Sequence, residues 1–546
     1  MRRGRQRSRL VVQIAVASII VGVVAVPAVA TMGTLSITVN TTLSEDHFGN
    51  ITIDADNVML DCADHMVTGS NGGSGIELVG RTGVTVKNCH VTGFHAGIQL
   101  VASSGNTIMG NTARDMFEGI ALAAGSDNNF IESNAADGNF FDGFLFQSSS
   151  NNTIIGNEAA GNIAQFSFEL GSNGNHLADN TAEGGVGFQF NNSDGNHLVN
   201  NTADGSSTPG DTGFEFSNSS GNTLEGNTVN DNGNGFVLSD SSGNTLNRNT
   251  SDDGDVGFLL EGSSSNMLLR NTASSAGFTG FRLVEASNNS LIRNQSINND
   301  EDFGHGFRLE GADWNHLERN TSFGGDDFVL DGSEYNTLVR NSATGDHDRT
   351  NIEETDGFLL LSGSNHNTLD RNTATSSGNS GFRIDGSSDN AFEGNQAFRN
   401  FGNGFLIRNN SEMNTFHGDT ATRNGNDGET DGFLIANSFD NTLVGVVGDR
   451  NSGSGIAILF GSDENRVEDS RVSHNTGFGI VVFLSSFNSI LGNTANSNDE
   501  IGIGVNGSFN VIESNRACHN TIVDARDDGT DNVWEDNTFC TTEGIS

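Results

Sequence analysis

The feature that most constrains this chain is a phrase, Asn-x-apolar-x-x-Asn, that returns about every 24 residues. It is clear from Asn106 to Asn111, and its last copy begins at Asn532. A second phrase, Gly-Phe/Ile-x-apolar, lies between successive copies, as at Gly257-Phe258. A period between 20 and 50 residues is typical of a solenoid or another repeat array.

The local pattern indicates which kind of solenoid this is. The apolar stretches are short, alternate with polar residues and are interrupted by Gly, Ser, Asn and Asp, which is typical of short strands joined by turns. Helical repeats are excluded by this pattern, and two strands per repeat are too few for a propeller blade. We therefore predict an all-β fold, a single-stranded parallel β-helix solenoid of about 20 coils of roughly 22–24 residues each.

Stacking explains the abundance of Phe and Asn. Equivalent residues of successive coils lie above one another at the strand spacing of ~4.8 Å. Phe side chains can then fill the interior, and Asn side chains can hydrogen-bond from layer to layer. We interpret the Asn column as structural.

The N-terminus is typical of an export signal. Five arginines precede an apolar run from Leu10 to Val26, and small residues follow at Ala28–Ala30. The alternative is an uncleaved anchor helix over Leu10–Ala30. We predict a secreted or extracytoplasmic protein with a signal peptide at 1–30, a cap and entrance segment at 31–56 and the β-helix at 57–546.

The four cysteines favour the same compartment. Cys62 and Cys89 are about one repeat apart, and so are Cys518 and Cys540. We predict two disulfides that join adjacent coils near the two ends of the solenoid.

The net charge restricts the partners. The chain carries 69 Asp and Glu against 26 Lys and Arg, a formal charge of −43. Proteins that bind nucleic acid hold its phosphates with Lys and Arg, so nucleic acid is excluded as a partner.

The two repeat phrases resemble the right-handed parallel β-helix proteins of the pectin-lyase-like superfamily, and most closely the NosD-like and CASH-type repeat proteins. The similarity extends over roughly residues 50–540 and includes the opening segments at 53–62 and 83–88. The resemblance implies a right-handed coil and an exported protein that often handles polysaccharide. It does not identify the activity, because one scaffold carries many activities.

The first candidate site is a basic column. In six consecutive coils an arginine stands four places after the first Asn of the repeat phrase. Stacked guanidinium groups suit the carboxylates, sulfates or phosphates of a linear anionic glycan. The alternative is charge balance, in which they pair with Glu261, Glu310, Asp331, Asp385 or the acidic remainder of the chain. The column consists of Arg248, Arg270, Arg293, Arg319, Arg340 and Arg371.

The second candidate site is acidic and lies in longer repeats, whose extra residues precede the Gly-Phe phrase. Insertions on one face of a solenoid often mark its binding face. Carboxylates there can bind calcium or act as acid and base in glycan cleavage; solvated loops are the alternative. The weak calcium candidates are Asp300, Asp302, Asp326 and Asp327, and the weak catalytic candidates are Asp346, Asp348, Arg349 and Glu353.

A third cluster combines Cys62 and Cys89 with His65, His90 and His95. Thiolate and imidazole groups are suitable ligands for zinc or copper, and the resemblance to NosD-like proteins suggests copper. The favoured interpretation is nevertheless the disulfide.

The expected function is binding of a carbohydrate or cell-envelope polysaccharide by a monomer. The alternatives are a lyase or hydrolase acting on an acidic glycan, a structural or adhesion protein, and a NosD-like periplasmic copper-related protein. No cofactor beyond calcium is expected, and a membrane is a partner only through an uncleaved signal.

Overall fold

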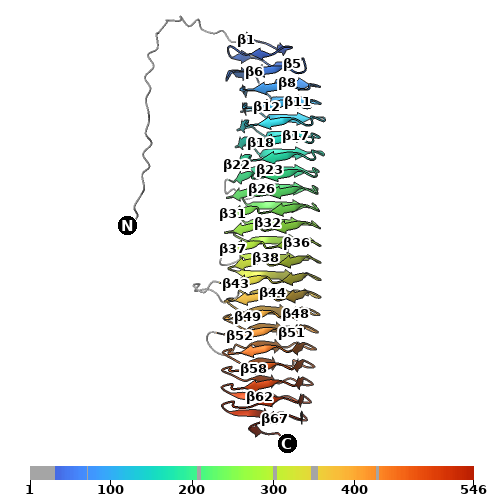
Figure 1. Ribbon diagram of the computed structural model, residues 1–546, viewed down its shortest axis with the longest axis vertical. Helices are drawn as coiled ribbons and strands as arrows, with labels where there is room; N and C mark the ends of the chain where they lie inside the picture. Colours follow the sequence, from blue (N-terminus) through green and yellow to red (C-terminus); the bar gives the residue numbers. More distant parts are fainter. Residues whose placement is uncertain are drawn as a thin grey trace, which may run out of the picture.

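Each repeat forms one turn of three short strands, one more than the two that the sequence pattern predicts, because the residues after the second Asn also form a strand. In a representative turn, β27 (Thr223–Glu225), β28 (Thr228–Asn230) and β29 (Asn234–Ser239) follow one another. The computed structural model describes residues 31–70, 72–205, 211–298, 304–345, 355–425 and 430–545, and its turns stack into a long rod (Figure 1). These ranges contain no helix, and hence no helix long and apolar enough to cross a membrane.

Equivalent strands of successive turns pair in parallel and build three sheets. β27 belongs to sheet C, β28 to sheet A and β29 to sheet B. The pairing keeps equivalent residues opposite one another, as with Leu224 and Leu246 or Phe236 and Phe258. The predicted all-β parallel β-helix is therefore confirmed, with about 21 turns.

The stacking already begins close to residue 31. β2 (Leu35–Ile37) pairs with β5 (Ile51–Ile53) in sheet B, and β3 (Thr41–Thr42) pairs with β6 (Met59–Asp61) in sheet C. The predicted signal peptide, residues 1–30, lies outside the described residues.

Stacked phenylalanines fill the interior behind sheet B. From Phe144 to Phe433 at least one Phe of each turn is buried, and neighbouring rings of this column are nearly parallel with centroids 4.6–4.9 Å apart. A glycine precedes most of these Phe residues and leaves room for this packing. At Gly257, for example, a Cβ atom would lie 2.6 Å from the Cβ of Ala273 and 2.7 Å from the carbonyl oxygen of Gly280.

The Asn columns form hydrogen-bonded ladders on both sides of sheet C. The Oδ1 atom of Asn271 accepts from the backbone N–H of Asn249 at 2.9 Å and from its Nδ2 at 3.1 Å. The same Nδ2 also donates to the carbonyl oxygen of Leu224 at 3.0 Å. Each buried amide therefore satisfies the hydrogen-bonding groups of the neighbouring turns. The ladders are part of the structure, as predicted.

Asp419 replaces an Asn in one ladder. Its Oδ1 accepts the usual two hydrogen bonds from Asn395 at 2.6 and 2.9 Å, while Oδ2 takes the place of the amide nitrogen and has no hydrogen-bond partner within the described ranges. Burial raises the pKa of Asp419 to about 7.

Both predicted disulfides are present. Cys62 bonds to Cys89 and Cys518 bonds to Cys540, with Cα atoms 4.8 and 5.2 Å apart. These distances match the spacing between neighbouring strands, so each bond joins two adjacent turns.

Candidate functional site

The outer face of sheet B adjoins the turns that carry the insertions. Residues 346–354 lie between β43 (Ser342–Thr344) of sheet A and β44 (Phe358–Leu361) of sheet B, and 299–303 and 426–429 occupy the same position in other turns. Their predicted site residues lie outside the described residues; these are Asp300, Asp302, Asp346, Asp348, Arg349 and Glu353.

Two calcium candidates, Asp326 and Asp327, begin β41 (Asp326–Asp331) and do not point to a common centre. Asp327 occupies the place of the glycine before Phe and is 1% exposed, and burial raises its pKa well above the usual value. Asp326 is half-buried, and its Oδ1 accepts from the backbone N–H of Asp356 at 2.7 Å. Adjacent residues of a strand point to opposite faces, so this pair alone does not form a cation site.

The predicted arginine column is real but lies elsewhere, at the turn from sheet C to sheet A. All six residues have left-handed backbones, with φ between 54° and 57°. Three pair with acids of sheet C: Arg248 with Glu225 at 3.3 Å, Arg319 with Glu318 at 2.6 Å and Arg371 with Asp370 at 3.0 Å. Within the described ranges, the other three have no ion pair; they are Arg270, Arg293 and Arg340.

The acids after the Phe strands do not pair with that column, so this part of the charge-balance interpretation is wrong. Glu310, Asp331 and Asp385 pair with arginines on the outer face of sheet B instead. Glu310 binds Arg282 through Nε and Nη2, both at 3.0 Å, and Arg308 through Nε at 2.7 Å. Asp385 binds Arg383 at 2.6 Å and Arg408 at 2.9 Å.

Asp356 is the most perturbed acid of this ion-pair network. Its Oδ1 accepts from the backbone N–H of Ser380 at 2.9 Å, and its Oδ2 lies 3.3 Å from Nη1 of Arg383. Burial, followed by the nearby Asp326, raises its pKa to about 7. The side chain is 0% exposed, so it has no surface for a ligand, and we interpret it as a structural group.

A pocket of about 450 Å³ hollows the outer face of sheet B at the third to sixth turns from the C-terminal end. Its floor is formed by β56 (Ile456–Leu459) and β59 (Ile480–Phe483). Its other lining residues lie in the turns that precede β53 (Phe433–Ala436), β56, β59 and β62 (Ile501–Asn506). Pockets of this size usually bind small molecules or single units of a polymer.

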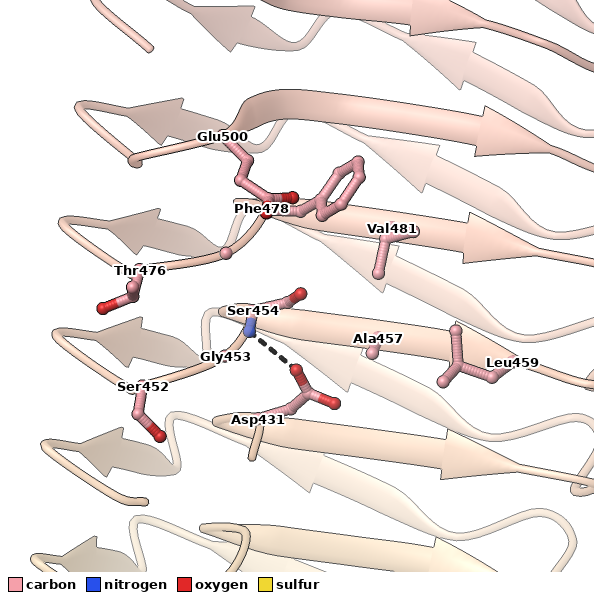
Figure 2. A pocket seen from close by; sticks show the side chains of 11 residues that line it. Asp431, Ser452, Gly453, Ser454, Ala457, Leu459, Thr476, Phe478, Val481 and Glu500 are labelled. Atoms are coloured by element: carbon pink, nitrogen blue, oxygen red, sulfur yellow. Dashed lines mark hydrogen bonds between the residues drawn. The ribbon is translucent and has the colours of Figure 1, made fainter. Parts of the chain in front are cut away.

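The pocket has an apolar floor and two acidic sides. Figure 2 shows Asp431 on one side, Phe478 and Glu500 on the other, and Ala457 and Val481 between them. Asp431 is held in place because its Oδ1 accepts from the backbone N–H of Ser454 at 2.6 Å. The lining of the pocket includes no Lys or Arg.

A glycine helps to shape the pocket wall. Gly504 stands where neighbouring turns have an outward side chain, and a Cβ there would lie 2.8 Å from Cε1 of Phe478. The ring of Phe478 therefore lies down against the sheet and closes one side of the pocket. The pocket is open to ligands, whereas Asp327 and Asp356, two acids with strongly raised pKa values, are buried and lie in other turns. We therefore place the candidate site at the pocket.

The residues that suggested zinc or copper do not form a metal site. Cys62 and Cys89 are oxidised to a disulfide, and the described part of the chain has no free cysteine. His65 lies 3.3 Å from Asp46, and His95 stacks on Phe117 at 5.0 Å. Across the described ranges, no group of three His, Cys, Asp or Glu side chains could hold a metal ion.

Comparison with known families gives two matches. The family model described as periplasmic copper-binding protein (NosD) matches residues 50–210, 202–321 and 417–543, together more than half of the chain. A model described as right-handed β-helix region matches residues 304–445. No curated protein matches the chain.

Similar solved structures include the Azotobacter vinelandii mannuronan C-5 epimerase AlgE4 A-module, at 12% identity and a TM-score of 0.38, which covers 56% of this chain and 88% of that one. Another is a mannuronic-acid-specific polysaccharide family 6 lyase from human gut microbiota, at 10% identity, a TM-score of 0.33, and coverage of 63% and 86%. Matches this distant carry no argument about function.

Proposed function

The chain belongs to the family described as periplasmic copper-binding protein NosD, and from that premise we propose that it is an extracytoplasmic protein that binds polysaccharide on the outer face of sheet B. The two disulfides support an oxidising compartment. Copper is not part of the proposal, because the described cysteines and histidines do not converge on a metal site.

The pocket carries the proposal. Aliphatic side chains at its floor and the ring of Phe478 suit the apolar face of a sugar, while Asp431 and Glu500 can accept hydrogen bonds from sugar hydroxyl groups. Since its lining offers two carboxylates and no cation, a uronate would be repelled. The expected ligand is a glycan without uronate units, and one of its sugar units lies in the pocket.

Binding to a panel of hexasaccharides by calorimetry tests the proposal: cellohexaose, laminarihexaose and mannohexaose as neutral probes, with hexaguluronate as the anionic one. We expect a neutral probe to bind and hexaguluronate not to bind at the pocket. Val481→Phe fills the pocket and should weaken binding by about tenfold or more.

The matched control is Leu259→Phe, which adds a ring at the equivalent outward position of β32 (Val256–Glu261), many turns away. An equal loss of affinity in both variants would refute the pocket as the site, and so would a failure of all neutral probes to bind. Release of new reducing ends from a bound probe would instead assign a hydrolase.

A second candidate is an anionic glycan on the arginine column. It is favoured by Arg270, Arg293 and Arg340, whose guanidinium groups have no ion pair within the described ranges and belong to one stacked column. An Arg270→Ala/Arg293→Ala double variant should then lose binding to heparin in low salt and retain binding to the neutral probe.

A further inference from the structure

A second exposed feature lies far from the pocket, where four rings gather on the turns from sheet A to sheet B. His95 stacks on Phe117 at 5.0 Å, and Phe117 lies 5.6 Å from Phe140 and 5.8 Å from Phe141. Phe140 and Phe141 meet edge to face at 4.8 Å. The three phenylalanines are 43%, 62% and 47% exposed. Rings exposed in this number on a soluble protein usually mark a binding surface.

The backbone sets three of these rings, those of His95, Phe117 and Phe141, in one column. The N–H of Phe117 donates to the carbonyl oxygen of His95, that of Phe141 to Phe117, and that of Ile163 to Phe141, at 2.9–3.1 Å. Ile163 is 58% exposed and extends the apolar column into a fourth turn. Four turns span about 14 Å along the rod, which is longer than one small molecule and suits a short run of polymer units.

Two carboxylates adjoin the column on the outer face of sheet B. Glu118 begins β14 (Glu118–Ala123), Asp142 begins β17 (Asp142–Gln147), and the two residues lie opposite each other in adjacent strands. Neither has an ion pair or a side-chain hydrogen bond with any described residue. Two carboxylates at the strand spacing repel each other, although His95 attracts Glu118.

The electrostatics agree with this geometry. Burial raises the pKa of Asp142 to about 7, with further contributions from Glu169 and Glu118. Burial also raises the pKa of Glu118. A cation placed between the two carboxylates would remove this repulsion, and the faces of the adjoining rings also attract cations.

We propose that this aromatic–acidic cluster, made of His95, Phe117, Phe140, Phe141, Glu118 and Asp142, binds sugar units that carry a free amino group. The rings pack against the sugar faces, and the carboxylates receive the ammonium group. The inference does not depend on the pocket, which lies about 60 Å away along the rod.

Titration with glucosamine hexamer and N-acetylglucosamine hexamer tests it, because acetylation removes the charge and keeps the sugar. With the full chain near neutral pH and in low salt, we expect the free amine form to bind at least about tenfold more tightly. Asp142→Asn and Phe117→Ala should each reduce that affinity severalfold. Phe117 is exposed, and the charged form of Asp142 is disfavoured in its surroundings. Neither substitution should therefore unfold the protein, and circular dichroism should show an unchanged fold.

The controls separate this site from general charge and from the pocket. Asp179→Asn changes an acid at another turn, with a φ of 55°, and should leave binding unchanged, as should Val481→Phe. Equal affinity for the two hexamers, no binding of either, or an unaltered affinity in Asp142→Asn would overturn the proposal. So would a dimer that sedimentation shows to be lost in Phe117→Ala, because a second copy would then cover the rings.

Discussion

The interior of the rod and the outer face of sheet B are built from the same strands but follow different rules. In the interior, Phe258 stacks on Phe281 and Asn249 bonds to Asn271 in the same way as their equivalents in other turns. On the outer face, the residue after Phe changes from Leu259 to Arg282 to Arg308 in three consecutive turns. The interior preserves the fold, whereas the outer face is free to vary and can therefore acquire binding sites.

The largest effect is expected from breaking the inner stack. Phe258→Ala removes a fully buried ring and leaves a cavity between two neighbours, which should lower the free energy of unfolding by about 3–5 kcal/mol. Leu259→Ala, one residue on and facing outward, should cost much less. Urea denaturation of the two variants measures the difference, and equal losses would contradict the inward and outward assignment.

Asp419→Asn should replace the buried Oδ2 by an amide nitrogen that can donate as in the other rungs, and should stabilise the protein by about 2–4 kcal/mol at alkaline pH. The folded-state pKa of about 7 lies above the ordinary value of 3.8. The folded protein therefore holds a proton that the unfolded chain has released, and stability falls as pH rises through this window.

Denaturation of wild type and Asp419→Asn at a series of pH values checks this prediction. The gain should be small near pH 4, grow as pH rises to about 7 and then level off. A gain that is independent of pH would show that Asp419 ionises normally in the folded protein.

The smallest effect is expected on the outer face. Arg282→Met removes one guanidinium from Glu310 but leaves Arg308 bound to it. Since Arg282 is about one-third exposed, its loss should change stability by less than about 1 kcal/mol, and added salt should shrink the change. A loss of stability as large as that caused by Phe258→Ala would show that these ion pairs contribute as much to stability as the buried core does.

The contrast also explains what the sequence could predict. Spacing alone indicated the coil, the ladders and both disulfides, because interior residues repeat in register. The same spacing placed the arginine column correctly as a column, but it could not show that Glu310 and Asp385 face different arginines on sheet B.

The candidate sites were missed because each departs from the repeat. Phe478 takes the place before Gly where Asp431 and Ser454 stand in neighbouring turns, and Gly504 replaces an outward side chain. Phe117 and Phe141 are likewise irregular residues in turns. Searching for positions that break each column, rather than those that keep it, would have indicated both places.

The most direct test is a crystal structure of the protein with the neutral hexasaccharide that binds most tightly. We expect sugar density over Val481, between Asp431 and Glu500, with a sugar ring packed against Phe478. Density confined to the arginine column or to the inserted turns, with this hollow empty, would contradict it.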